Sequence, residues 1–183
     1  MITIYQTIQD TGNPDKIEQD GPIFCSANDA WLGKGYYFWE SNISNAHWWG
    51  KEHLRGNYII CSANYEKDSN CFDLIDNPIH RKLMEGAIDE MQDKGLYING
   101  QTTVARIISF LRGIGVFKFS STRAYAIGCR RANSDYDNRI KFNQNNIAYL
   151  DLRPLYQICF YTKTVINDYK IVYPDYYVDG YVI

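Results

Sequence analysis

Short runs in which hydrophobic and polar residues alternate occur along most of the chain, and this period of two predicts β-strands. Gly, Pro and Asn separate many of the runs, as expected for turns. The polar stretch 10–22 is expected to be a loop that has room for a short helical turn. The predicted strands are residues 2–7, 36–39, 57–64, 115–120, 125–129, 147–152, 156–162 and 169–173.

Three segments carry apolar residues at helical spacing instead: about 42–54, the run between Asn77 and Gly95, and about 102–112. Pro78 suits the first position of the middle helix, Asn77 can cap it, and Gly95 suits the residue after its end. The order of elements is short strands with helices inserted in the first two-thirds. It therefore predicts an α+β fold and not alternating βαβ units.

Composition then limits the class of protein. The chain has 183 residues, of which 45% are hydrophobic and 22% charged, so we expect one globular domain spanning 1–183. No run approaches the roughly 18 apolar residues of a membrane span, and the N-terminus does not read as a signal peptide, so we expect no membrane partner and a cytoplasmic location. The five cysteines form no C-x-x-C, and the histidines form no H-E-x-x-H, so we expect no metal site.

Positive charge is concentrated between Arg106 and Lys141. The formal charge of the whole chain is −2, but this segment holds eight Arg or Lys residues against two Asp, a net charge of +6 (8 − 2). It is either a solvated face or the contact for an anionic partner, such as a dinucleotide phosphate or a nucleic-acid strand. Tyr125, Tyr136 and Phe142 are interleaved with the charges and can stack on bases.

Aromatic residues gather around a glycine-containing segment at 33–35. In the strand that follows, Tyr37 and Trp39 share one face, and the next helix brings back Trp48 and Trp49. Rings that converge from a strand and a helix can sandwich a flat heteroaromatic molecule; the alternative is a small aromatic core.

The run GKGYYF at 33–38, with the following Asn45, Ala46 and Trp48, resembles the NAD-binding segment of ADP-ribosyltransferases of the poly(ADP-ribose) polymerase and diphtheria-toxin class. More narrowly, it resembles small bacterial polymerase-like domains. The resemblance implies a split antiparallel β-sheet with helices inserted between strands. It also implies that Gly35 and Tyr37 belong to the nicotinamide site, with Tyr37 stacking on the ring.

The same resemblance assigns roles to residues of the helix and of the first strand. Trp48 becomes the second wall of the nicotinamide site, and Asn45 replaces a serine that binds the carboxamide. The family's Y-H-G-T strand corresponds to Tyr5-Gln6-Thr7. Matching tyrosines puts Gln6 at the ribose-binding histidine, which we prefer, and matching threonines puts Tyr5 there. The backbone at Gln6 or Thr7 would hold the carboxamide.

Gln157, in the predicted strand 156–162, takes the place of the family's catalytic glutamate. An amide gives only a neutral hydrogen bond to the ribose and does not act as a general base near neutral pH. The resemblance therefore implies single transfer of ADP-ribose without chain elongation, with Gln157, Tyr37 and Gln6 as the catalytic set. Asp151 and Glu40 are the acids that would substitute for the glutamate.

These residues predict an NAD-dependent mono-ADP-ribosyltransferase that modifies a protein or a nucleic acid. The alternatives are an NAD glycohydrolase on the same fold and a non-catalytic binding module. In the binding of NAD, Arg123, Arg130 and Arg131 would hold the pyrophosphate, if they do not face water. By analogy with small stand-alone transferases, a toxin or antiphage effector with an antitoxin or inhibitor protein as partner is expected.

Overall fold

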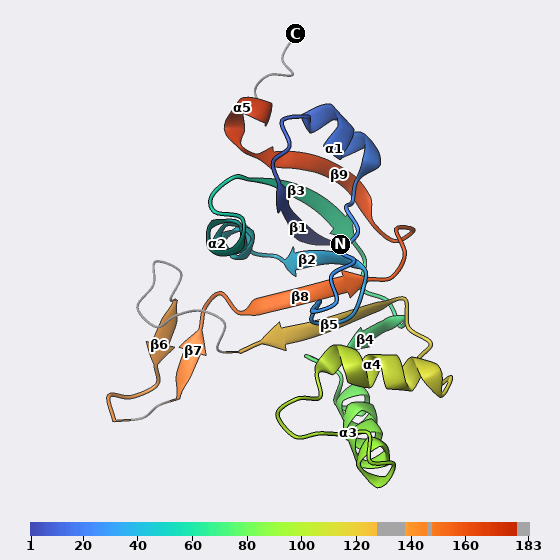
Figure 1. Ribbon diagram of the computed structural model, residues 1–183. Helices are drawn as coiled ribbons and strands as arrows, with labels where there is room; N and C mark the ends of the chain where they lie inside the picture. The colour runs from blue at the N-terminus through green and yellow to red at the C-terminus, as the bar shows by residue number, and fades with distance from the viewer. Residues whose placement is uncertain (128–137, 146–147, 179–183) are drawn as a thin grey trace.

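The computed structural model describes residues 1–127, 138–145 and 148–178. Within them, seven strands form a sheet with the order β4-β5-β8-β2-β1-β3-β9 (Figure 1). Neighbours are antiparallel except β4 and β5, which are parallel. The strands of this sheet are β1 (Ile2–Gln9), β2 (Tyr36–Glu40), β3 (Tyr58–Tyr65), β4 (Cys71–Asp73), β5 (Ser121–Ala126), β8 (Leu155–Phe160) and β9 (Asn167–Tyr173).

Helices cover separate parts of this sheet. Figure 1 shows α2 beside β1 and β2, α3 and α4 beside β4 and β5, and α1 and α5 near β9. A separate hairpin pairs β6 (Arg139–Lys141) with β7 (Tyr149–Asp151). The predicted α+β class is confirmed. The helices are α1 (Pro14–Asp20), α2 (Ile43–His53), α3 (Pro78–Asp93), α4 (Val104–Gly113) and α5 (Asp175–Val178).

Asn42 caps α2, because its side-chain oxygen accepts a hydrogen bond from the Ser44 amide at 3.0 Å. One local prediction is corrected. Residues 115–120 are not a strand, and β5 begins only at Ser121. Their apolar residues serve packing instead: Phe117, one of this segment's rings, lies 5.3 Å from the ring of Phe72, edge to face.

The sheet consists of two halves that are joined over a short length. β1 pairs with β3 along all eight residues, whereas β1 and β2 pair only at Ile4–Glu40 and Tyr5–Trp39. β2 continues along β8 for four pairs. Beyond Tyr5 the two central strands therefore part, and the sheet is open between them.

Side chains of β2 alternate between the two faces, as a strand requires. Phe38 joins a buried cluster that includes Ile4 and Ile158. Trp39 packs on the other face with the residues of α2, and Tyr37 packs against the cluster of α3 and α4. The prediction that Tyr37 and Trp39 share a face is confirmed, and that face is the one next to the opening.

A buried ion network ties β2 to β4 and β5. Arg123 contacts both oxygens of Glu40 at 2.6 and 2.9 Å, and its Nη1 lies 3.2 Å from Asp73 and 2.6 Å from Asp76. Burial raises the pKa of Asp73, but hydrogen bonds from the Asp76 amide and from Lys67 outweigh it and lower that pKa to about 2. The Arg123 guanidinium is thus committed inside the protein and is not available to a pyrophosphate.

No helix within the described ranges combines the length and the apolar character that crossing a membrane would require.

The ion network generates a stability prediction. Arg123→Ala leaves the buried carboxylate of Glu40 without its cation and Asp73 with Lys67 alone, so we expect a loss of about 3–5 kcal/mol in the free energy of unfolding. Lys94→Ala, which removes an exposed pair with Glu90 at 2.6 Å, should cost only about 0.3–0.5 kcal/mol. Urea unfolding measures both; equal losses would contradict a structural role for the network.

Candidate functional site

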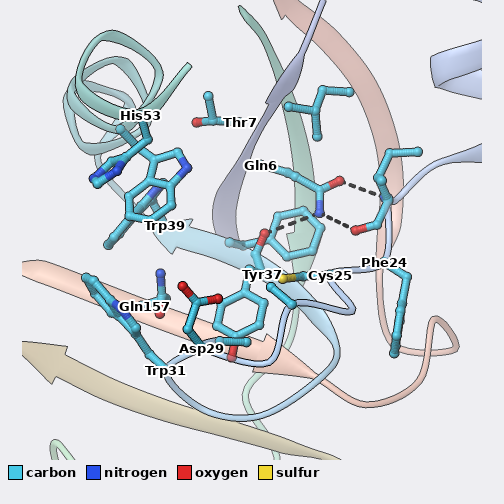
Figure 2. A pocket seen from close by; sticks show the side chains of 16 residues that line it. Gln6, Thr7, Phe24, Cys25, Asp29, Trp31, Tyr37, Trp39, His53 and Gln157 are labelled. Atoms are coloured by element: carbon cyan, nitrogen blue, oxygen red, sulfur yellow. Dashed lines mark hydrogen bonds between the residues drawn. The ribbon is translucent and has the colours of Figure 1, made fainter. Parts of the chain in front are cut away.

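A pocket of about 470 Å³ opens where β1 and β2 part. Its volume falls within the roughly 300–1,000 Å³ of small-molecule sites. Figure 2 shows side chains from the strands, from α2 and from the 22–35 loop facing this space. The lining residues are Gln6, Thr7, Ile8, Ile23, Phe24, Cys25, Ala27, Asp29, Ala30, Trp31, Tyr37, Phe38, Trp39, Trp49, His53 and Gln157.

The amide of Gln6 fastens the 22–35 loop to the open edge of β1. Its Nε2 donates to the carbonyl oxygens of Ile23 at 2.8 Å and Tyr37 at 3.3 Å (Figure 2). Its Oε1 accepts from the Ile23 amide and from the Tyr169 hydroxyl, each at 2.8 Å. These four bonds use both donors and both lone pairs of the amide. The geometry thus corrects the predicted ribose contact: the Gln6 side chain has no hydrogen-bonding capacity left for a ligand.

Tyr37 holds the other end of the same loop. Its hydroxyl accepts from the Leu32 amide at 2.7 Å and donates to the Gly33 carbonyl at 2.6 Å. Gly33 has a φ of +91°, a conformation that favours glycine. Burial raises the pKa of Tyr37 far above its ordinary value, so the phenol stays protonated and keeps both bonds.

Three tryptophans form one wall of the pocket. The ring centroids of Trp31 and Trp49 are 5.9 Å apart, those of Trp31 and Trp39 are 6.3 Å apart, and both pairs meet edge to face. Trp39 and Trp49 are also 5.9 Å apart. The ring of His53 lies on Trp49 at 3.8 Å with an interplanar angle of 31°. Mutual contact fixes these rings before any ligand arrives, so the wall is preformed.

Gln157 brings an unsatisfied polar atom to the pocket. Gln157 is 7% exposed, and its Oε1 has no hydrogen-bond partner among the described residues. A buried acceptor without a partner costs about 1–3 kcal/mol. Gln157 lines the pocket and lies beside it in Figure 2, so its amide is a polar group of the lining although the oxygen itself is buried.

The structure brings together four of the predicted site residues: Gln6, Thr7, Tyr37 and Gln157 all line the pocket. The Thr7 hydroxyl donates to the Ala46 carbonyl of α2 at 2.9 Å. It therefore helps to hold the helix beside the strand.

Trp48 is not at the pocket, which corrects its predicted place opposite Tyr37. It is 5% exposed and packs in the core with Tyr58 and Leu155. Successive residues of a helix point about 100° apart, since 3.6 residues make one turn. The neighbouring Trp49 faces the pocket instead.

The remaining predicted residues also lie outside the lining. Asn45 is fully buried and donates to the Pro154 carbonyl at 3.0 Å, which ties α2 to the start of β8. Tyr5 packs beside the tryptophan cluster. Gly35 pairs with Cys25 through two backbone hydrogen bonds of 2.8 and 3.1 Å. A Cβ at Gly35 would lie 2.5 Å from the Phe160 carbonyl oxygen, so this glycine permits close packing of the strands.

The two acids predicted to replace the missing glutamate do not reach the pocket. Glu40 belongs to the Arg123 ion pair on the opposite face of β2. Asp151 lies in β7, where its carboxylate accepts from the Arg153 amide at 2.9 Å. Asp29, which sequence reasoning did not select, carries the only carboxyl group among the described lining residues.

The basic segment does not form one surface at the pocket. Arg112 stacks on the Tyr161 ring at 3.8 Å, Arg139 lies 4.9 Å from the Tyr149 ring, and Arg123 is buried. None of its described residues lines the pocket. Arg130, Arg131, Asp135, Tyr136 and Asp137 lie outside the described residues.

Sequence reasoning missed the loop residues because nothing in the polar stretch before Gly33 shows where it will fold. The signal that existed was indirect: Asp29 and Trp31 lie just before the glycine-containing segment at 33–35.

No protein-family model, curated protein or solved structure shows significant similarity to this chain. Among the described residues, no group of three or more His, Cys, Asp or Glu side chains is arranged to hold a metal ion.

The Gln6 contacts generate a prediction about the loop. Gln6→Ala leaves the Ile23 amide and carbonyl without their partners, so hydrogen exchange at Ile23 and Leu32 should accelerate at least about tenfold, while Ile60 in β3 stays protected. Gln9→Ala is the matched control, because Gln9 lies on the same strand but is exposed, and its side chain donates to the Asn57 carbonyl at 2.7 Å and not to the loop. Unchanged exchange at Ile23 would show that the amide does not hold the loop.

Proposed function

We propose that this protein is a mono-ADP-ribosyltransferase that binds the nicotinamide end of NAD in the pocket between β1 and β2. The observation that carries the proposal is the combination, in one pocket, of a preformed aromatic wall with the amide of Gln157, whose buried Oε1 has no partner among the described residues. The opening of the sheet at this point supports the split β-sheet that the sequence resemblance implies.

The aromatic lining suits a flat cationic ring. The nicotinamide of NAD carries a positive charge, and the faces of Trp and Tyr rings attract cations by about 0.5–2 kcal/mol. Tyr37 and Trp49 line the pocket from β2 and α2. In the proposal, Trp49 takes the role that the resemblance gave to Trp48.

Gln157 would accept a hydrogen bond from a ribose hydroxyl or from the carboxamide. Binding then satisfies an acceptor that is otherwise buried alone, which favours a ligand with a donor at that point. Because the amide bears no charge, it holds the substrate without taking a proton. This supports a single transfer rather than elongation of a chain.

The acceptor is a macromolecule in this proposal, either a protein or a nucleic acid. Arg106, Lys118 and Lys141 are exposed and remain candidates for its contact. Incubation with labelled NAD and cell lysate distinguishes the functions: a transferase labels the protein or nucleic-acid fraction. A glycohydrolase releases ADP-ribose quickly from NAD alone, and a binding module does neither.

The first activity prediction concerns Tyr37. Tyr37→Ala removes both the ring and the hydroxyl that holds the loop, so kcat/KM for NAD cleavage should fall at least about tenfold, which is about 1.4 kcal/mol. Tyr36→Ala is the control, since its ring is not part of the lining. Release of labelled nicotinamide measures both. Full activity in Tyr37→Ala would place the reaction elsewhere.

The second activity prediction concerns Gln157. Gln157→Glu converts a neutral acceptor into a charged one, and the stronger hydrogen bond to the substrate should raise NAD cleavage about fivefold, which is about 1 kcal/mol. Gln9→Glu introduces the same charge on the exposed side of β1 and should change nothing. If both variants cleave NAD at the wild-type rate, position 157 does not face the reacting ribose.

A further inference from the structure

We infer that Asp29 is the catalytic carboxylate of this pocket. It faces the ribosyl carbon as positive charge develops there and takes the proton of the attacking nucleophile. The inference rests on the proposed function and names the residue that performs the chemistry in the absence of a glutamate at position 157. Asp29 lies in the 22–35 loop, outside the strands and the helix to which the resemblance assigned the site residues.

The position of Asp29 supports this role. Figure 2 shows its carboxylate directed into the space between Gln157, Trp39 and Tyr37. The backbone on both sides of it is held, by Gln6 at Ile23 and by the Tyr37 hydroxyl at 32–33. The carboxylate is therefore carried by a segment that is fixed to the sheet at two points.

Asp29 is also available for chemistry. Within the described part of the chain, its side chain makes no hydrogen bond or ion pair, and the residue is exposed to the pocket. Glu40 differs in both respects, because it is buried and bound to Arg123. The protein thus contains one acid that is used for structure on one face of β2 and one that is free on the other.

Other titratable groups of the lining fit the role less well. The Tyr37 phenol has a raised pKa because of burial and is bound to the loop backbone. Cys25 is a lone thiol in a backbone bridge. His53 is the rival base, but its ring lies flat on Trp49 at 3.8 Å, as a packing group would.

The proposed reaction replaces the nicotinamide of NAD by the nucleophile of the acceptor. The bond between C1′ of the ribose and the nicotinamide nitrogen breaks, and its electron pair returns to the ring, which leaves as neutral nicotinamide. An oxygen or nitrogen nucleophile of the acceptor, or water, forms the new bond to C1′, and its proton passes to the Asp29 carboxylate. The negative charge of the carboxylate stabilises the positive charge that develops on the ribose in the transition state.

The experiment compares Asp29→Asn with wild type. The isosteric amide removes charge and basicity while keeping shape, so kcat for NAD cleavage should fall about 100-fold or more. NAD affinity, measured by quenching of tryptophan fluorescence, should change less than about threefold, and the thermal unfolding midpoint should stay the same. Asp20→Asn, at the exposed end of α1, is the matched control and should retain wild-type kcat.

Each outcome decides a different point. If wild type cleaves NAD and Asp29→Asn retains its kcat, the role of Asp29 is overturned while the proposed function stands. If Asp29→Asn keeps its kcat and His53→Ala loses it, the base is His53. If wild type neither binds nor cleaves NAD, the proposed function falls, and the role of Asp29 falls with it.

Discussion

The amide of Gln6 bridges the place where the sheet comes apart. β1 and β2 share two residue pairs and then separate, which leaves backbone and side-chain groups at the edge of each half. Gln6 bonds to the Tyr37 carbonyl at the edge of β2, to the amide and carbonyl of Ile23 and to the Tyr169 hydroxyl, and so fastens the 22–35 loop across the gap. The Gln6 amide and the Tyr37 hydroxyl together fix the loop so that Asp29 and Trp31 face Tyr37 and Trp39. The pocket therefore depends on a polar side chain that has no capacity left to bind a ligand.

The two faces of β2 carry different kinds of side chain. One face ends in Glu40, which is paired with Arg123 in a network that reaches β4 and β5. The other presents Tyr37 and Trp39 to the pocket. In the proposed function, the charge-paired Glu40 serves stability on the first face, and Asp29, beside the second, serves the reaction. A single carboxylate with both roles would need to lose its ion pair in order to react.

Sequence reasoning placed the candidate site at β2, where the pocket lies, but it selected a tryptophan of α2 that does not line the pocket. The period of two in β2 identified the face that Tyr37 and Trp39 share, because alternation follows from strand geometry alone. In α2 the motif selected Trp48, whereas the helix turns Trp49 toward the pocket. The rotation of α2 against the sheet is set by its packing on Tyr58, a contact between distant segments that a local pattern does not show.

The sequence by itself determined the α+β class, three of the five described helices and the aromatic strand with its glycines, because local periodicity and capping chemistry decide these features. Only the tertiary structure decided which polar groups are consumed and which are left free. Gln6 and Arg123 are saturated by partners 17 or more residues away, while Gln157 keeps an unused oxygen. Hydrogen bonds between distant segments form only after the strands are placed. Whether a side chain keeps an unused donor or acceptor is therefore a property of the fold and not of its neighbours in the sequence.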